Sequence, residues 1–105
     1  MILAITSCST PDEADRIASA LVDERLAACV QIHAARSVYR WAGRIERADE
    51  WTLHIKTREA LADAVRDRIA ALHSYDLPEF IALKVGTASA DYAAWVEAET
   101  KVDDL

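Results

Sequence analysis

The segment "ACVQIHAARSVYRWAGRIERADEWTLHIK", residues 28–56, decides the fold because it predicts two long strands around one turn. Apolar side chains alternate with polar or small ones in both halves, at Val30, Ile32, Trp51, Leu53 and Ile55. An alternation with period two is typical of a strand that has one apolar face. Between the halves, Gly43 is the only clear turn signal. The segment therefore predicts a long β-hairpin.

A strand and a helix are predicted before the hairpin. Residues 2–7 form a short apolar run, which we expect to be a strand buried on both faces. Thr10, Pro11 and Glu13 then have the spacing of a capping box, with proline at the first helical position. The helix should end near Arg25. Its apolar positions recur at helical spacing: Ala14, Ile17, Ala18, Leu21 and Val22.

A second helix, a third strand region and a last helix are predicted after the hairpin. Thr57 is placed to cap the second helix, and Ser89 is placed to cap the last one. Residues 80–85 form an apolar run that predicts a core strand between these helices. The apolar residues of the two helices are Leu61, Val65, Ile69 and Leu72 in the second helix, and Tyr92, Trp95 and Val96 in the last.

The resulting order of elements is β-α-β-β-α-β-α. It predicts an α+β fold, the ferredoxin-like split β-α-β sandwich with a C-terminal helix, in which helices cover one face of an antiparallel sheet. The other face of the sheet would stay bare and carry residues such as Tyr39, His54 and Phe80. A bare face of apolar and mixed character on so small a protein predicts self-association.

Length and composition place the chain among ordinary folded proteins. At 105 residues it has the usual size of one domain, so we expect residues 1–105 to form a single domain. The 29% of charged residues argues against disorder, and the 52% of hydrophobic residues suggests that one face is covered by another subunit. A net charge of −6, without a basic stripe that carries interleaved aromatic residues, argues against a nucleic-acid partner.

The sequence also carries signals about the compartment. No apolar window approaches the roughly 18 residues of a membrane-spanning helix. The opening residues, "MILAITSC", have no basic region and too short an apolar run for a signal peptide. Cys8 and Cys29 form neither a CxxC motif nor part of a Cys/His zinc pattern. We therefore expect a cytoplasmic protein with reduced thiols and no membrane contact.

Five blocks of the sequence resemble the CutA divalent-cation-tolerance family, in order and over nearly the whole chain. They are "TSCSTPDEADRIASALVDERLAACVQI" at 6–32, "SVYRWAGRIERADEW" at 37–51, "LHIKT" at 53–57, "LHSYDLPEFIAL" at 72–83 and "DYAAWV" at 91–96. Each block alone is a weak signal, but together they are specific. The chain departs from the family pattern at several positions: Leu72 in place of histidine, Ser74 in place of proline, Ala42 in place of an acid, and residues 33–36 in place of a Pro-Gly break.

The resemblance implies a ferredoxin-like fold and a tight homotrimer formed through the sheets and the long hairpins. It implies a role in tolerance to divalent metals, with copper or another divalent cation bound. Members of this family are also similar to the PII signalling proteins in shape and assembly. An alternative is therefore a PII-like sensor trimer that binds a small ligand between subunits and signals to an unidentified protein partner. A third reading is a structural trimer whose metal binding is incidental.

Cys8 and His73 are the candidate metal ligands. A thiolate and an imidazole together suit copper and zinc, and the resemblance places copper ligands at a cysteine in this position and at histidines around residue 73. Cys8 stands just before a predicted helix N-terminus, which should lower the pKa of its thiol. Water, Asp76 or a neighbouring subunit would complete the site. The alternative is a buried, unreactive Cys8 and a His73 that satisfies the last carbonyls of its helix.

A second candidate site is a ligand-binding cleft between subunits. Lysine on the mixed face of a sheet needs a carboxylate partner or a ligand, which draws attention to Lys56. The alternative for Lys56 is an interfacial salt bridge that fixes the trimer, with Glu46, Glu50 or Glu79 as its partner. The residues expected to line the cleft are Lys56, Glu79, Tyr75, Tyr39 and Trp41.

The remaining reactive side chains give weaker signals. Cys29 lies among small apolar residues and is expected to pack in the core. His33 and His54 lie on strands, where each alone is more often packed or exposed than metal-bound. None of the common hydrolase, P-loop or dinucleotide motifs is present. A Cys8–His73 pair would lack an orienting group and an oxyanion hole, so we do not expect an enzyme.

Overall fold

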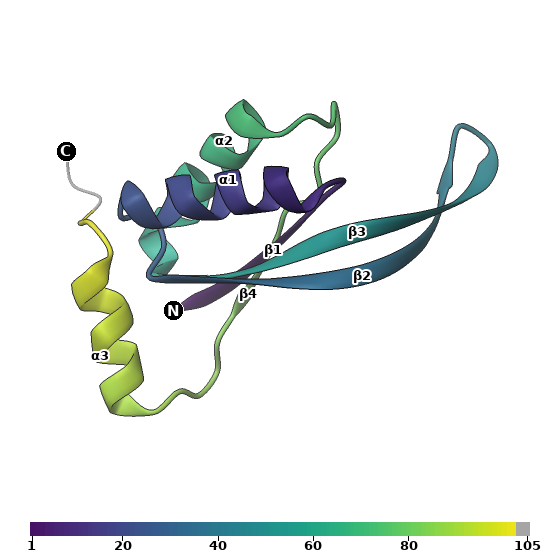
Figure 1. Ribbon diagram of the computed structural model, residues 1–105. Coiled ribbons are helices and arrows are strands. Elements are labelled where there is room, and N and C mark those ends of the chain that lie inside the picture. Colours follow the sequence, from purple (N-terminus) through teal and green to yellow (C-terminus); the bar gives the residue numbers. More distant parts are fainter. Residues whose placement is uncertain (103–105) are drawn as a thin grey trace.

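The computed structural model describes residues 1–102 and places four strands in one antiparallel sheet (Figure 1). The strands are β1 (Ile2–Cys8), β2 (Cys29–Trp41), β3 (Arg44–Thr57) and β4 (Ile81–Lys84). The helices are α1 (Pro11–Asp23), α2 (Ala62–Leu72) and α3 (Ala90–Glu99), and a short 3₁₀-helix, η1 (Glu59–Leu61), precedes α2. The sheet order is β2-β3-β1-β4. This order confirms the predicted α+β, ferredoxin-like arrangement.

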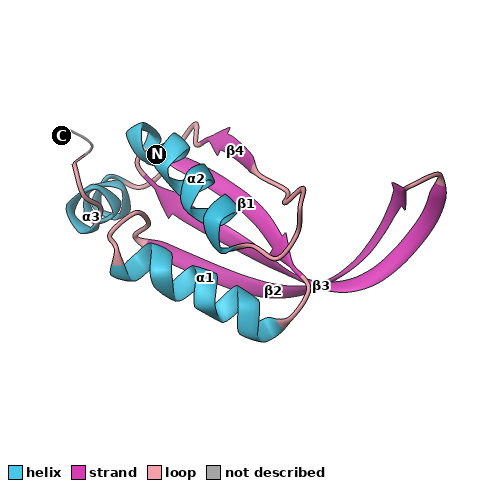
Figure 2. Cartoon of the chain, turned by 90° about the horizontal axis from the view of Figure 1, so that it is seen from above, coloured by secondary structure: helices cyan, strands magenta, loops and turns pink. Residues whose placement is uncertain are grey.

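The β2–β3 hairpin is longer than the rest of the sheet and curls away beyond the ends of α1 and α2 (Figure 2). Its strands pair from Cys29 opposite Lys56 to Trp41 opposite Arg44. The two-residue turn between them has positive φ at both positions, 51° at Ala42 and 80° at Gly43, as a type I′ hairpin requires. Gly43 was the predicted turn residue. The positive φ of Ala42 was not foreseen.

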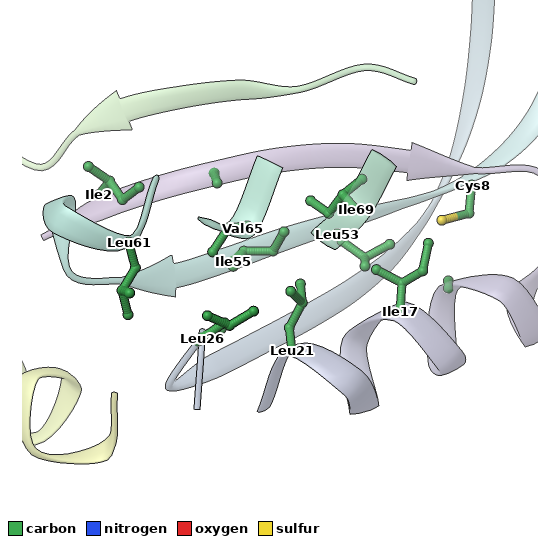
Figure 3. Close-up of a cluster of buried hydrophobic side chains, with 13 residues drawn as sticks. Ile2, Cys8, Ile17, Leu21, Leu26, Leu53, Ile55, Leu61, Val65 and Ile69 are labelled. Atoms are coloured by element: carbon green, nitrogen blue, oxygen red, sulfur yellow. The ribbon is translucent and has the colours of Figure 1, made fainter. Parts of the chain in front are cut away.

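The hydrophobic core lies between one face of the sheet and helices α1 and α2 (Figure 3). The strands contribute alternate residues to it, and the helices contribute one apolar stripe each, as the periodicities predict. The two predicted helical stripes therefore face the same core. The largest fully buried core residues are Ile17, Leu21, Leu53, Ile55, Leu61, Val65 and Ile69.

The face of the sheet that α1 and α2 leave bare is partly apolar. Leu3 lies opposite Leu83 and Ile5 lies opposite Ile81. Leu83 is 50% exposed and Ile81 is 47% exposed. The prediction that residues 80–85 form a core strand was therefore wrong for this chain alone, because all four residues of the edge strand β4 are exposed and only Phe80, just before it, packs against the core. On β1, the bare-side residues Leu3 and Ile5 are likewise only partly buried.

Two predicted helix caps differ from the structure. Thr57 ends β3 and does not cap a helix, because its buried hydroxyl donates to the main-chain oxygen of Leu26 at 2.7 Å. Thr10 does cap α1, and its hydroxyl accepts from the N–H of Glu13 at 3.1 Å. Ser89 occupies the N-cap position of α3 without a side-chain hydrogen bond. Thr10 and Ser89 therefore occupy the predicted N-cap positions, but only Thr10 makes the predicted bond.

Helix α3 is held by its C-terminal end. The guanidinium of Arg58 donates to the hydroxyl of Thr100 at 2.9 Å and to the carbonyl of Glu97. Arg25 donates to the carbonyl of Ala98 at 3.0 Å. These arginines satisfy carbonyls that a helix leaves unpaired at its end. Within residues 1–102, no helix is both long and apolar enough to cross a membrane.

Candidate functional site

Three segments bring possible metal-binding atoms together at one end of the sheet. Cys8 ends β1, Glu13 lies in the first turn of α1, and His73 follows α2. One sulfur, oxygen or nitrogen atom from each residue lies within 4.8 Å of the others. The structure thus brings Cys8 and His73 together and adds Glu13, which the sequence analysis used only as a helix cap. Its place three residues after Thr10 was the signal that it sits beside Cys8.

Glu13 connects the start of α1 with the loop after α2. Its carboxylate accepts from the N–H of Ser9 at 3.4 Å and from the N–H of Ser74 at 2.7 Å. Burial raises the pKa of Glu13, but the hydrogen bonds from Ser74 and Ser9 lower that pKa more, so the net shift is downward. Glu13 is therefore an ionised group, only 4% exposed, that accepts hydrogen bonds from two separate segments.

The imidazole of His73 is buried, and both of its nitrogens are engaged. Nε2 lies 2.7 Å from the main-chain oxygen of Ser7, and Nδ1 accepts from the N–H of Tyr75 at 3.1 Å. Because a carbonyl only accepts, Nε2 must carry the proton. Nδ1 also lies 3.9 Å from a carboxylate oxygen of Glu13. His73 thus bonds across to β1, and the alternative in which its side chain satisfies the carbonyls of its own helix was wrong.

Cys8 is fully buried, and its thiol is not activated. Burial, followed by the negative charge of Glu13, raises its pKa from 9.0 to about 12. The expectation that the start of α1 lowers this pKa was wrong. The carboxylate of Glu13 accepts from Ser9, the residue after Cys8, and so places a negative charge beside the thiol. Burial and this charge together outweigh any effect of the start of α1.

The donor set of Cys8, Glu13 and His73 fits a borderline or soft ion. Sulfur, imidazole nitrogen and carboxylate oxygen are the ligand types that zinc and copper accept. Asp76, a predicted fourth ligand, is not in this group and lines the neighbouring cleft instead. To hold an ion, Cys8 must lose its proton and His73 must exchange the Tyr75 N–H at Nδ1. The residues fit such a site chemically, at the cost of one main-chain hydrogen bond.

A cleft of about 580 Å³ lies between the curled hairpin and the loop that follows α2. Four of the five predicted ligand-binding residues line it: Tyr39, Trp41, Tyr75 and Glu79. The other lining residues are Ser7, Ser37, Val38, Glu50, Asp76 and Leu77. Its size is typical of a small-molecule site.

Two hydrogen bonds fix carboxylates in this cleft. The hydroxyl of Tyr75 donates to Glu50 at 2.8 Å, and that of Ser7 donates to Glu79 at 3.1 Å. Burial, followed by the hydrogen bond to Glu50, raises the pKa of Tyr75 to about 12. The sequence analysis had considered Glu50 only as a partner for Lys56. The cleft therefore presents two oriented carboxylates beside aromatic rings.

Lys56 lies outside this cleft. Its ammonium donates to the side-chain oxygen of Gln31 at 2.8 Å and lies 5.9 Å from the ring centre of Tyr92. Lys56 stands near the end of β3, whereas Glu50 stands near its middle. The strand register therefore separates Lys56 from the carboxylates that were its expected partners. Within one chain, the predicted grouping of Lys56 with the cleft residues is not formed.

The other histidines and Cys29 lie on the bare side of the sheet. The rings of His33 and His54 are 4.8 Å apart between centres and tilted by 49°. Cys29 pairs with Lys56 and is half-buried. The prediction that Cys29 packs in the core was therefore wrong, because its position in the register faces it away from the helices.

Comparison with known proteins agrees with this fold and with the sequence blocks. The family model for the CutA1 divalent ion tolerance protein matches residues 2–99. The divalent-cation tolerance protein CutA of Pyrococcus horikoshii is 37% identical over 101 residues, which cover 96% of this chain and 99% of that protein.

Solved structures give the same result. The crystal structure of CutA1 from Pyrococcus horikoshii has a TM-score of 0.94 and 35% identity, with 97% of this chain and 100% of that chain covered. The periplasmic divalent cation tolerance protein CutA from Archaeoglobus fulgidus has a TM-score of 0.94 and 32% identity, with coverage of 96% and 100%. The resemblance stated from the sequence blocks is confirmed, and the chain belongs to the CutA1 divalent ion tolerance protein family.

Proposed function

We propose that this protein acts in tolerance to divalent metal ions and binds copper or another divalent cation at Cys8, Glu13 and His73. The observation that carries the proposal is the meeting of these three donor groups from three separate segments. Family membership supports the role in metal tolerance. Bound there, an ion would be a cargo or signal held by side chains. We propose no catalytic reaction, because the buried, protonated thiol of Cys8 is a poor nucleophile.

We also propose that the working form is a cytoplasmic homotrimer. The exposed apolar side chains on the bare sheet face, Ile81 and Leu83 among them, support self-association. The edge strands β2 and β4 also leave main-chain groups available for pairing. Free Cys8 and Cys29 fit a reducing compartment. Sedimentation equilibrium should give three times the chain mass, and Leu83→Glu should lower it.

Metal titration tests the proposed ligands. Zn(II) titrated by calorimetry, and Co(II) followed by its sulfur-to-metal absorption, should bind the wild-type protein. Affinity should fall by about tenfold or more in Cys8→Ser, Glu13→Gln and His73→Ala. Only Cys8→Ser should remove the sulfur-to-cobalt band completely. Unchanged affinity in all three variants would contradict the assignment.

The neighbouring imidazoles of His33 and His54 provide the control. They lie on the bare sheet face and could take up an ion nonspecifically. The double variant His33→Ala/His54→Ala should keep both the affinity and the cobalt band. Loss of binding in this variant, with binding retained in Cys8→Ser, would move the metal site to the bare face.

A second candidate function is ligand sensing by the same trimer, with an unidentified protein partner. The cleft of about 580 Å³ favours it, because its aromatic and carboxylate lining is independent of the three metal-binding groups. Trp41 lines the cleft and can report occupancy by fluorescence. A ligand should change the emission of the wild-type protein but not that of Trp41→Phe. An identical change in both would place the ligand elsewhere.

A further inference from the structure

We infer that the loop between α2 and β4, residues 73–80, is a lid that must open before the proposed metal site takes up an ion. The inference rests on the metal binding proposed above and concerns how that site is controlled. The main-chain N–H groups of Ser74 and Tyr75 hold the lid closed on two of the candidate ligands, Glu13 and His73. Both hydrogen bonds lie within one chain, so they do not depend on how subunits assemble.

The three candidate ligands are closed off from solvent. The side chain of His73 is 0% exposed and that of Glu13 is 5% exposed, and Cys8 is 0% exposed. Association with further subunits can only add to this burial. A metal ion therefore reaches these side chains only after a part of the chain has moved away.

The lid is the part of this enclosure that opens most easily. Cys8 belongs to β1, which pairs with β3 on one side and β4 on the other, and Glu13 belongs to α1, which packs on the core. Residues 73–80 form neither a helix nor a strand. A segment outside the helices and the sheet opens at a lower free-energy cost than a paired strand or a packed helix. The loop is therefore the element that gives access to the site.

The closed lid occupies the atoms that an ion needs. Oε2 of Glu13 accepts from the N–H of Ser74 at 2.7 Å, and it lies 3.9 Å from Nδ1 of His73, which accepts from the N–H of Tyr75 at 3.1 Å. Because Nε2 keeps its proton on the carbonyl of Ser7, Nδ1 is the nitrogen left for an ion. An unprotonated ring nitrogen has one lone pair, so metal coordination and the Tyr75 hydrogen bond exclude each other at Nδ1.

The side chain of Tyr75 fastens the lid on its other side. Its hydroxyl donates to Glu50 of β3 at 2.8 Å, and its ring centre lies 4.7 Å from that of His73. Each hydrogen bond that holds the lid favours the closed form over the open form. Removing one of them should therefore shift this equilibrium toward the open form by about tenfold.

The rate of cobalt uptake tests the lid. Co(II) is mixed with the metal-free protein at rising concentration, and the sulfur-to-metal absorption is followed by stopped flow. In the wild type the rate should level off, because opening of the lid becomes limiting. Tyr75→Phe removes the hydrogen bond to Glu50 and should raise the limiting rate about tenfold.

Ser74→Pro should also raise the limiting rate, because proline has no N–H to donate to Glu13. The backbone of His73 already has φ of −80° and ψ of 144°, which suits the residue before a proline. Ser74→Ala is the matched control, because it keeps the main-chain N–H, and it should raise the rate less than Ser74→Pro. Tyr92→Phe removes a phenol hydroxyl from α3, outside the lid, and should leave the rate unchanged.

Three results of the uptake experiment would overturn the inference. The first is a wild-type rate that rises in proportion to cobalt concentration, because no opening step would then be limiting. The second is a limiting rate that Ser74→Pro and Tyr75→Phe leave unchanged, because ionisation of the Cys8 thiol would then set it. The third is an equal effect of Ser74→Ala and Ser74→Pro, because the N–H would then play no part.

Nitrogen-15 NMR of the histidine rings separates failure of the lid from failure of the metal site. With zinc bound, Nε2 of His73 should keep its proton, and Nδ1 should exchange the hydrogen bond from Tyr75 for the metal. Zinc at Nε2 with the Tyr75 bond intact would overturn the lid while leaving metal binding in place. No binding of cobalt or zinc by the wild type, Ser74→Pro or Tyr75→Phe would overturn both.

Discussion

His73 Nε2 lies 2.7 Å from the main-chain oxygen of Ser7, and this bond joins the loop after α2 to the end of β1. Ser7 in turn donates its hydroxyl to Glu79 in the cleft at 3.1 Å. Ser7 of β1 therefore connects the candidate metal group with the cleft. The Nδ1 atom of the same imidazole holds the N–H of Tyr75, whose hydroxyl bonds Glu50. Two short chains of hydrogen bonds, one through Ser7 and one through Tyr75, therefore connect His73 to the cleft.

Replacing His73 should destabilise the fold in the absence of any metal. His73→Ala leaves the buried main-chain oxygen of Ser7 and the N–H of Tyr75 without partners. Each lost partner costs about 1–3 kcal/mol, so the free energy of unfolding should fall by about 2–6 kcal/mol. Urea unfolding in the presence of a chelator measures it at fixed protomer concentration. A loss below about 0.5 kcal/mol would show that these hydrogen bonds are not important.

Glu13 should make the protein sensitive to acid. Its pKa is lowered on folding, so its stabilising contribution is complete above the unfolded pKa and is lost as the pH falls through the folded pKa. Glu13→Gln should therefore be less stable than the wild type at pH 7. The two unfolding free energies should converge below about pH 4, under the ordinary value of a glutamate. Curves that stay parallel from pH 7 to pH 3 would contradict the predicted shift.

The thiol of Cys8 should be unreactive in the folded protein. With a pKa of about 12, roughly one thiol in a thousand is ionised at pH 9. In a Cys29→Ser background, labelling by a disulfide reagent should be about a hundredfold slower in the native state than in urea. A rise from pH 7 to pH 9 should leave that native rate limited by opening of the fold. Rapid native labelling would indicate an accessible thiolate and favour an activated cysteine.

Local patterns in the sequence were sufficient to predict the fold. The period-two alternation around Gly43 gave the hairpin, and the spacing of Ile17 and Leu21 gave the buried stripe of α1. These signals are local, because a strand or helix must place its apolar residues on one side. The burial of residues 80–85 could not be predicted from such local patterns. It depends on which sheet face the two helices cover, and only the assembled topology decides that.

The sites could be predicted only in part, because side-chain partners depend on register. Cys8 and His73 were paired by their chemistry, and the structure brings them close together, but Glu13 was interpreted only as a cap. Lys56 was grouped with Glu79 by residue type, although the pairing of β2 with β3 gives it Gln31 as a partner. Charge complementarity in a sequence does not specify distance. The pKa of the Cys8 thiol likewise depends on burial and on the Glu13 carboxylate at the start of α1, and the sequence alone specifies neither.

A buried hydroxyl without a partner marks a position where the core can be improved. Thr6 is fully buried on β1, and its Oγ1 has no hydrogen-bond partner within residues 1–102. Thr6→Val keeps the shape and removes the unsatisfied hydroxyl, so the free energy of unfolding should rise by about 1 kcal/mol.

Thr57→Val is the matched control for this change. Thr57 is equally buried, but its hydroxyl donates to the carbonyl of Leu26 at 2.7 Å. This substitution should lower the free energy of unfolding by about 1–2 kcal/mol. Urea midpoints of the two variants should move in opposite directions. Destabilisation by both would mean that Thr6 has a hydrogen-bond partner after all, such as an ordered water.

The hairpin turn offers a test of backbone strain far from both sites. Ala42 has φ of 51°, in the left-handed region that costs a residue with a β-carbon about 1–2 kcal/mol. Ala42→Asn creates the Asn-Gly pair that type I′ turns prefer, so thermal unfolding should shift upward by an amount equivalent to about 0.5–1 kcal/mol. Gly43→Ala is the control, because a β-carbon there meets no atom within 4 Å while φ is 80°. It should therefore destabilise through conformation alone, and a neutral result for both variants would show that the turn relaxes without cost.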